Sequence, residues 1–299
     1  MSEQFYQQIT PGEAFSLLGD DLRLEILQTL WETDDRRLPF SELYDAVDVD
    51  DTGQFNYHLD KLVGQFVAKT GDGYRLTQAG RDVNGAIASG TYTVEGELDP
   101  IELDASCRMC GGNQTLRYDG EIVEVDCDSC ASGWEGIVPP AVLAGRDRGA
   151  IPRVVSDHLR TQFRRIASGF CRYCSGETVP TVGPLEELGV GAEPDPDSDR
   201  PNNHPAVQFD CRRCGHRSGL SLDHALLLVE PEVERFFYEH GVPVREVPVW
   251  NVPELERENA EVVGTDPLRA RAGFRIDDSV LVVTVDGAFS VLETDNRDD

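Results

Sequence analysis

The sequence predicts an α+β protein made of several modules, and three observations support this fold class. Residues 11–90 repeat apolar residues at helical spacing and end in a hairpin pattern. Residues 104–230 contain eight cysteines in four Cys-x-x-Cys pairs, and residues 231–295 alternate apolar and polar residues as strands do. With 299 residues, 39% of them apolar, the chain is long enough to bury more than one hydrophobic core.

The chain is strongly acidic. It has 27 Lys and Arg against 55 Asp and Glu, which gives a formal net charge of −28, and only Lys61 and Lys69 among the bases are lysines. This charge on a chain with ordinary apolar content is typical of halophilic proteins, whose carboxylates keep them soluble in strong salt. No apolar run approaches about 20 residues, and the N-terminus has no basic stretch before an apolar one. We therefore expect a halophilic, archaeal, cytoplasmic protein with no membrane partner.

The first predicted domain, residues 11–90, begins with helices. Its apolar residues recur at spacings of three and four, at Phe15, Leu18, Leu22, Ile26 and Leu30. Gly19-Asp20-Asp21 interrupts this stretch, so we expect two helices, with an Asp capping the second. A short third helix is expected from Ser41, with Ser41 as its N-cap.

A fourth helix and a hairpin complete this domain. A helix that opens at Thr52 or Gly53 places its apolar residues on one face, at Phe55, Leu59, Leu62 and Val63. Residues 66–70 and 74–76 are expected as two strands joined by the Gly71-Asp72-Gly73 turn. Thr77 then caps a last helix.

Three segments of this domain resemble, in the right order, motifs of ArsR-like winged helix-turn-helix regulators. Leu22–Leu27 resembles their R-x-x-I-L second helix, Phe55–Leu62 their Y-H-L-x-x-L recognition helix, and Tyr74–Gly80 the Y-x-L-T-x-x-G end of their wing. The resemblance covers residues 13–84 and implies a winged helix of haloarchaeal type, double-stranded DNA as partner and a homodimer. No cysteine precedes Cys107, so the metal-sensing cysteines of ArsR proteins are absent.

The same resemblance implies which residues meet DNA. The helix near Thr52 would enter the major groove, and the wing would contact phosphates. The residues placed on or beside the DNA are Gln54, Asn56, Tyr57, His58, Lys61, Lys69 and Arg75. Residues 55–81 hold four bases and two acids, a net of +2, whereas residues 1–92 hold 7 bases and 16 acids, a net of −9. This local charge suits a polyanion, although a buried helix is also less acidic than loops.

The cysteines form four knuckles with none left over: Cys107 and Cys110, Cys127 and Cys130, Cys171 and Cys174, Cys211 and Cys214. In a cytosolic protein, such pairs indicate metal sites rather than disulfides. The chain also repeats itself, because Cys107–Gly112 parallels Cys171–Gly176 and Val125–Cys130 parallels Phe209–Cys214. The repeat resembles a duplicated zinc ribbon, which implies two zinc ions, one for each four-cysteine set.

The two ribbons define two further domains. We expect the first ribbon at residues 104–150, and a helix with the second ribbon at residues 151–230, including a flexible insert at 186–203. Four thiolates close the coordination of one tetrahedral zinc, so the expected role is structural. A redox-sensitive or regulatory zinc site is the alternative. We expect the ribbons to have little core of their own and to depend on the metal for folding.

Two regions have a less defined role. Helix 154–166 carries Arg160, Arg164 and Arg165 with Arg153 before it, and these bases suit either DNA or acidic residues of the same chain. Residues 231–295 are expected as a short helix followed by a small antiparallel sheet, including a strand at 244–252, with a disordered tail at 296–299. This last domain would pair protomers, bind a ligand, contact the transcription machinery or simply stabilise the chain.

Taken together, the sequence predicts a DNA-binding transcriptional regulator and not an enzyme. No Gly-rich phosphate loop, no Ser/His/Asp set at interpretable spacing and no open metal site is found. The alternative is a general or accessory factor that acts mainly on RNA polymerase, as archaeal transcription factor E does.

Overall fold

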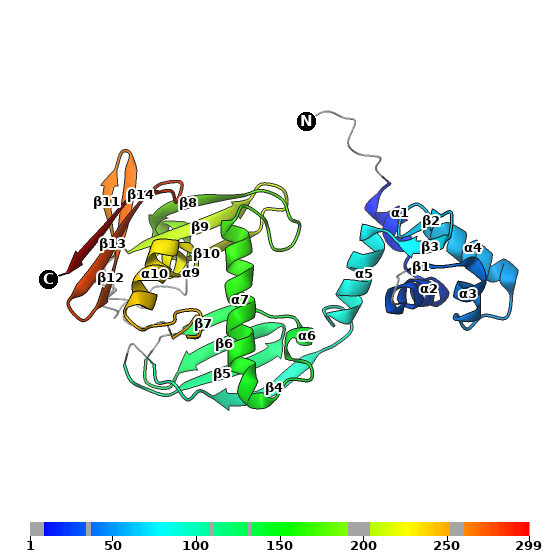
Figure 1. Ribbon diagram of the computed structural model, residues 1–299, viewed down its shortest axis with the longest axis horizontal. Coiled ribbons are helices and arrows are strands. Elements are labelled where there is room, and N and C mark those ends of the chain that lie inside the picture. The colour runs from blue at the N-terminus through cyan, green and yellow to red at the C-terminus, as the bar shows by residue number, and fades with distance from the viewer. Residues whose placement is uncertain are drawn as a thin grey trace. The chain divides into compact units, whose positions relative to one another are not determined.

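The computed structural model describes residues 9–33, 37–107, 110–130, 133–190, 204–251 and 260–298. The chain divides into two compact units, Met1–Val94 and Glu95–Asp299. Figure 1 shows a first unit of helices around a small sheet, and a second unit of three sheets with helices packed against them. Within the described residues, no helix combines the length and the apolar character needed to span a bilayer.

The first unit follows the predicted order of helices and hairpin. Its elements are α1 (Pro11–Ser16), α2 (Asp21–Glu32), β1 (Arg37–Leu38), α3 (Phe40–Asp45), α4 (Thr52–Leu62), β2 (Val67–Thr70), β3 (Gly73–Leu76) and α5 (Gln78–Ala88). Asp20 caps α2 by accepting a hydrogen bond from the amide of Arg23, and Thr77 caps α5 by accepting one from the amide of Gly80. The predicted break and these two caps are therefore confirmed. Helix α3 begins two residues earlier than expected, because Pro39 and not Ser41 is its N-cap.

A three-stranded antiparallel sheet in the order β1-β3-β2 backs these helices. Strand β1 was not predicted. It requires Gly73 at the start of β3, because a Cβ there would lie 2.2 Å from the carbonyl oxygen of Leu38. The core between sheet and helices is formed by Ile26, Leu27, Leu30, Leu43, Phe55, Leu59, Leu62 and Leu76, all fully buried.

The second unit contains three antiparallel sheets. The first is β4 (Gly96–Glu102), β5 (Gln114–Gly120), β6 (Ile122–Cys127) and β7 (Gly133–Ile137); the second, in the order β10-β9-β8, is β8 (Thr178–Pro184), β9 (Pro205–Cys211) and β10 (Arg217–Ser221); the third is β11 (Glu261–Thr265), β12 (Leu268–Ile276), β13 (Ser279–Asp286) and β14 (Val291–Asp298). The helices are α6 (Pro140–Leu143), the 3-10 helix η2 (Arg148–Ala150), α7 (Ile151–Ala167), α8 (Leu185–Leu188), α9 (Leu222–Val229) and α10 (Pro231–Glu239).

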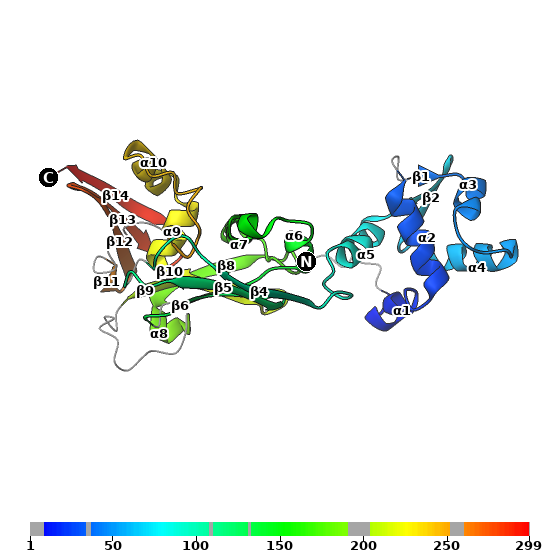
Figure 2. The ribbon, with the colours of Figure 1, turned by 90° about the horizontal axis from the view of Figure 1, so that it is seen from below.

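Helix α7 joins the first two sheets. Leu159 of α7 packs directly against Gly136 of β7. If Gly136 carried a Cβ, that atom would lie 2.6 Å from the side chain of Leu159. One turn further on, Phe163 meets Phe209 of β9 edge to face, with ring centroids 5.6 Å apart. Figure 2 shows the long helix lying over both sheets.

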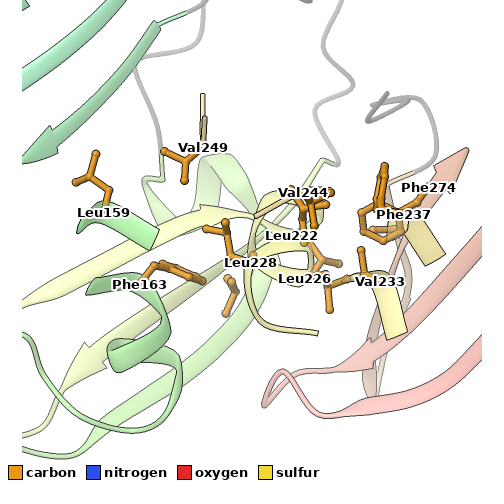
Figure 3. Close-up of a cluster of buried hydrophobic side chains, with 14 of the residues drawn as sticks. Leu159, Phe163, Leu222, Leu226, Leu228, Val233, Phe237, Val244, Val249 and Phe274 are labelled. Atoms are coloured by element: carbon orange, nitrogen blue, oxygen red, sulfur yellow. The ribbon is translucent and has the colours of Figure 1, made fainter. Parts of the chain in front are cut away.

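The third sheet belongs to the same core. Phe237 of α10 stacks edge to face on Phe274 of β12, and Leu226 of α9 lies in the cluster between them and α7 (Figure 3). A single cluster of buried side chains extends from Ile101 in the first sheet to Val285 in the third. The regions predicted as separate domains at 104–150, 151–230 and 231–295 thus share one hydrophobic core. The ribbons, expected to have little core of their own, contribute their buried side chains to this shared core.

Several local expectations also differ from the structure. Residues 96–102, which lie between the predicted first domain and the predicted first ribbon, form β4, and the tail to Asp298 is paired in β14 rather than disordered. The described part of the expected strand at 244–252 forms turns, although Val244 and Val249 are buried as core residues. The predicted flexible insert begins with helix α8, and its residues 191–203 lie outside the described part of the chain.

Candidate metal centres and the exposed face of helix α4

The fold brings the eight cysteines together in the two predicted sets. In the first set, the Sγ atoms of Cys107 and Cys130 are 3.8 Å apart, and those of Cys110 and Cys127 are 3.4 Å apart. Within each set, all four sulfur atoms lie within 4.8 Å of one another, so each set could hold a metal ion. The equivalent distances in the second set are 3.7 Å for Cys171 and Cys214 and 3.5 Å for Cys174 and Cys211.

These separations fit a tetrahedral metal site. Metal–sulfur bonds of about 2.3 Å, the length found with zinc, place the sulfurs of a regular tetrahedron about 3.8 Å apart. The measured pairs, at 3.4 to 3.8 Å, are close to this edge length. Sulfurs in disulfides would instead be bonded at about 2.05 Å.

Backbone amides stabilise the sulfurs in each knuckle. The amide of Gly112 donates to Cys110 Sγ at 3.4 Å, and the amide of Gly176 donates to Cys174 Sγ at the same distance. The chain turns sharply after the second cysteine, where Gly111, Ser175 and Gly215 adopt positive φ angles of 76°, 56° and 74°. These turns aim amides at the thiolates, which favours the ionised form that binds metal.

The pKa values show that the sulfurs compete for ionisation when no cation is bound. Hydrogen bonds from the backbone of Cys214 and of Arg213, opposed by burial, lower the pKa of Cys211 to about 6. The amide of His216 lowers the pKa of Cys214, but the sulfurs of Cys174 and Cys211 and burial outweigh it and raise that pKa to about 12. Four thiolates at this spacing repel one another, and a bound dication removes the repulsion.

In the first set, Cys110 behaves as Cys214 does in the second. The amide of Gly112 lowers its pKa, but the sulfurs of Cys127 and Cys130 outweigh this hydrogen bond and raise the pKa of Cys110 to about 12. Both clusters therefore have the donor chemistry of a closed metal site with four sulfur ligands.

The second cluster is tied to the rest of its unit by three side-chain hydrogen bonds. Thr178 Oγ1 donates to the Ile166 carbonyl at 2.7 Å, which fixes the knuckle to the end of α7. An Arg165 Nη donates to Ser175 Oγ at 2.7 Å, and an Arg172 Nη donates to the carbonyl of Ile137, at the end of β7, at 3.1 Å. Cys171 and Cys211 are buried, as is Cys107 of the first cluster.

In the first unit, α4 presents one face to the core and another to solvent. Phe55, Leu59 and Leu62 are fully buried. Gln54, Asn56 and Lys61 are exposed, and Tyr57 is 56% exposed with the Lys61 ammonium 5.4 Å from its ring centroid.

The predicted DNA residue His58 lies apart from this exposed face. Its side chain is only 13% exposed, and its Nδ1 is 3.1 Å from Asp20 Oδ1 at the start of α2. His58 is three residues after Phe55 and four before Leu62, so helix geometry places it at the border of the buried face. Its contacts indicate that it positions α4 against α2.

The predicted wing residues lie on the hairpin. Lys69 of β2 is exposed with its ammonium 5.6 Å from the Tyr74 ring centroid, and Arg75 of β3 is exposed. Arg75 is paired in register with Arg37 of β1, whose guanidinium contacts Asp72 at 2.8 Å in the hairpin turn. Arg37 adds to this surface a base that is not among the predicted DNA-contacting residues.

The arginines of α7 have different surroundings. Arg160 is 4% exposed and donates to the carbonyl of Val247 at 2.7 Å. Arg164 donates to the carbonyl of Leu228 at 2.8 Å and lies 3.7 Å from Glu234. For these two residues, the structure favours contacts within the chain over contacts with DNA.

The buried acid Asp223, at the start of α9, is not among the residues predicted from the sequence. It is 3% exposed, and its Oδ1 lies 3.5 Å from Nε2 of His204. The only signal in the sequence was an acid inside an apolar helix, beside His224.

Two family models match the chain. Residues 104–291 match a family described as a domain of unknown function, DUF7351, and residues 11–87 match a second domain of unknown function, DUF7347. The first match covers more than half of the 299 residues, so the chain belongs to the DUF7351 family. No curated protein and no solved structure matches the chain.

Proposed function

We propose that this protein is a DNA-binding transcriptional regulator whose first unit is a winged helix-turn-helix. The observation that carries the proposal is α4, which is anchored by Phe55, Leu59 and Leu62 and leaves Asn56, Tyr57 and other polar residues exposed. A helix anchored on one side with amide and amine groups on the other is suited to read base edges in the major groove.

The elements around α4 support this assignment. Helix α3 precedes it through a short turn, and the β2–β3 hairpin follows it, as the wing follows the recognition helix in winged helices. Lys69 and Arg75 are exposed on that hairpin and are available for phosphates.

We further propose that each four-cysteine cluster holds one zinc ion with a structural role. The sulfur spacing fits tetrahedral zinc, and four cysteines leave no position for a substrate. Cys107, Cys110, Cys127 and Cys130 would bind one ion, and Cys171, Cys174, Cys211 and Cys214 the other. Zinc would neutralise the clustered thiolates and fix the knuckles at the ends of the sheets.

The proposed DNA complex involves a homodimer. Helix α1 buries none of its six residues, and Phe15 in it is 70% exposed. A second copy would cover this apolar side chain and present two α4 helices to successive major grooves.

Two variants of α4 test the DNA assignment. The highest-affinity duplex is first selected from genomic fragments, and binding is then compared by gel shift at one salt concentration. Asn56→Ala should lower the affinity for the selected site by about 5- to 150-fold relative to the affinity for unrelated duplex, because a bidentate amide–base contact contributes about 1–3 kcal/mol of discrimination. Lys61→Ala should weaken binding to all sequences if its amine contacts a phosphate.

Gln28→Ala, at an exposed position of α2, is the matched control and should leave binding unchanged. Equal retention of the selected duplex by wild type and by the Asn56→Ala/Lys61→Ala double variant would refute the proposal. Copurification with RNA polymerase without affinity for duplex DNA would instead indicate a general transcription factor.

A further inference from the structure

The surface around the second four-cysteine cluster is unusually basic for this chain. It carries five arginines and two aromatic rings, here called the arginine patch: Arg165, Arg172, Arg212, Arg213, Arg217, Tyr173 and His216. Apart from the half-buried Arg172 and His216, these residues are exposed. In a chain with a net charge of −28, such a concentration of bases requires an explanation.

Short contacts join these residues into one surface. The Tyr173 ring meets the His216 ring edge to face at 4.6 Å, and the Arg172 guanidinium lies 5.0 Å from the Tyr173 centroid. Arg165 donates a hydrogen bond to Ser175 of the same knuckle. Arg213 packs closely on Gly176: if Gly176 carried a Cβ, that atom would lie 2.7 Å from the Cβ of Arg213.

The patch keeps a positive charge after its internal ion pairs are counted. Arg212 pairs with Glu177 at 3.1 Å, and Arg217 pairs with Asp210 at 3.1 Å. Within the described part of the chain, Arg165, Arg172 and Arg213 form no ion pair. The five arginines and these two acids leave a net charge of +3.

The first cluster provides an internal comparison, because its knuckles parallel those of the second. Its residues Asp128, Ser129 and Gly133 stand where the second cluster has Arg212, Arg213 and Arg217. The net charge at these three positions is −1 in one copy and +3 in the other. Both clusters contain four cysteines, so compensation of thiolate charge does not explain the arginines at these three positions of the second.

We propose that the arginine patch binds the phosphate backbone of nucleic acid, as a contact surface separate from α4. Guanidinium groups bind phosphate oxygens in a bidentate manner, and Tyr173, 56% exposed, adds an aromatic contact for a sugar or base. Nothing in the patch distinguishes one base from another, so the binding is independent of sequence.

The test uses the full-length, metal-loaded chain and the double variant Arg212→Asp/Arg213→Ser, which gives the second cluster the residues of the first. Binding to a fluorescent duplex of arbitrary sequence is measured by anisotropy across a range of KCl concentrations, with a single strand of the same length as a second probe. Each lost phosphate contact removes about 0.9 from the slope of log K against log salt for duplex and about 0.7 for a single strand. Two lost contacts weaken duplex binding about ninefold at about 0.3 M KCl.

The control variant is Arg146→Asp/Arg269→Ser, which makes the same charge change at two exposed positions outside the patch. Metal content and thermal melting must match wild type in both variants. A much smaller effect of the control, with the expected change in slope for the patch variant, supports the proposal. Equal effects of the two variants, or no effect of the patch variant on either probe, would overturn it.

Two further outcomes are decisive. Polyglutamate bound as tightly as duplex, with the same dependence on Arg212 and Arg213, would show that the patch receives an acidic protein instead, and would overturn the proposal. Because Asn56→Ala affects only the selected site and the patch variant affects every sequence, failure of the DNA assignment for α4 and failure of the patch are distinguished by the same binding series.

Discussion

Replacing Phe209 with alanine tests whether the three sheets of the second unit share one core. Phe209, in β9, is 2% exposed, and its ring meets Phe163 of α7 at 5.6 Å and Phe289 at 5.8 Å, both nearly perpendicular. Truncation of a buried phenylalanine costs about 3–5 kcal/mol. In a unit of this size each kcal/mol lowers the melting temperature by about 2–4 °C, so a loss of about 4 kcal/mol corresponds to about 8–16 °C.

The assay follows the first sheet while the second is perturbed. Trp134 of β7 packs against the shared core, and the other tryptophans, Trp31 and Trp250, are replaced with phenylalanine so that Trp134 alone reports. If the core is continuous, the Trp134 fluorescence transition moves by the same amount as the transition seen by circular dichroism.

Phe170→Ala is the control. It removes the same side chain in the same unit, but Phe170 is 56% exposed. It should change the stability by no more than about 0.5 kcal/mol. A Trp134 transition that stays in place while part of the dichroism signal melts early would refute the shared core and would restore the separate domains that the sequence suggested.

Two other predictions concern the metal and a buried acid. Removal of the metal by a chelator should lower the melting temperature and increase hydrogen exchange in the knuckles while the sheets stay folded, because the cluster of apolar side chains that joins the three sheets contains no cysteine, although Cys107, Cys171 and Cys211 are themselves buried. Unchanged melting after verified metal loss would contradict a structural role. Burial of Asp223 raises its pKa, but His204 and His224 outweigh burial and hold that pKa below its ordinary value. Its carboxylate therefore stabilises the fold above a pH of about 4, and this stabilisation is lost as the pH falls through the folded pKa. The difference in unfolding free energy between wild type and Asp223→Asn, measured by denaturant titration, should shrink from pH about 5 towards pH about 3. A difference that stays constant across this range would contradict a stabilising role of the ionised Asp223.

Local signals in the sequence were sufficient for much of the first unit. Asp20 and Thr77 precede helices and offer a side-chain oxygen to the first free amides, so the helix starts could be predicted without knowledge of the fold. The cysteine pairs were equally informative, because the spacing within a knuckle and the order of knuckles already limit which sulfurs can meet.

Strands that depend on distant partners were missed. Strand β4 contains Pro100 and several acids and resembles a linker, and the register shift between Leu98 and Ile101 breaks the alternation that identifies a strand. The tail of β14 is polar, but Asn296 pairs with Leu281 in the neighbouring strand, so its order comes from the ladder and not from its own composition.

The direction of individual side chains was the least accessible property. The resemblance placed His58 with Asn56 and Tyr57, whereas helical spacing from Phe55 and Leu62 already indicated a position at the border of the core. A motif thus identified the helix, and only the periodicity within it could separate a residue that faces a partner from one that holds the helix in place.

The two copies of the knuckle show that the fold does not require an arginine at position 212. In both copies the residue after the third cysteine makes the same backbone hydrogen bond, from Asp128 to the Asn113 carbonyl and from Arg212 to the Glu177 carbonyl, each at 3.0 Å. In the first copy the Asp128 side chain adds to this link by accepting hydrogen bonds from the amide and the side chain of Asn113. In the second copy, the side-chain pair of Arg212 and Glu177 is about two-thirds exposed on both sides and contributes little, about 0–1 kcal/mol. The backbone therefore closes the knuckle in either copy, and a basic side chain at this position is not required by the fold.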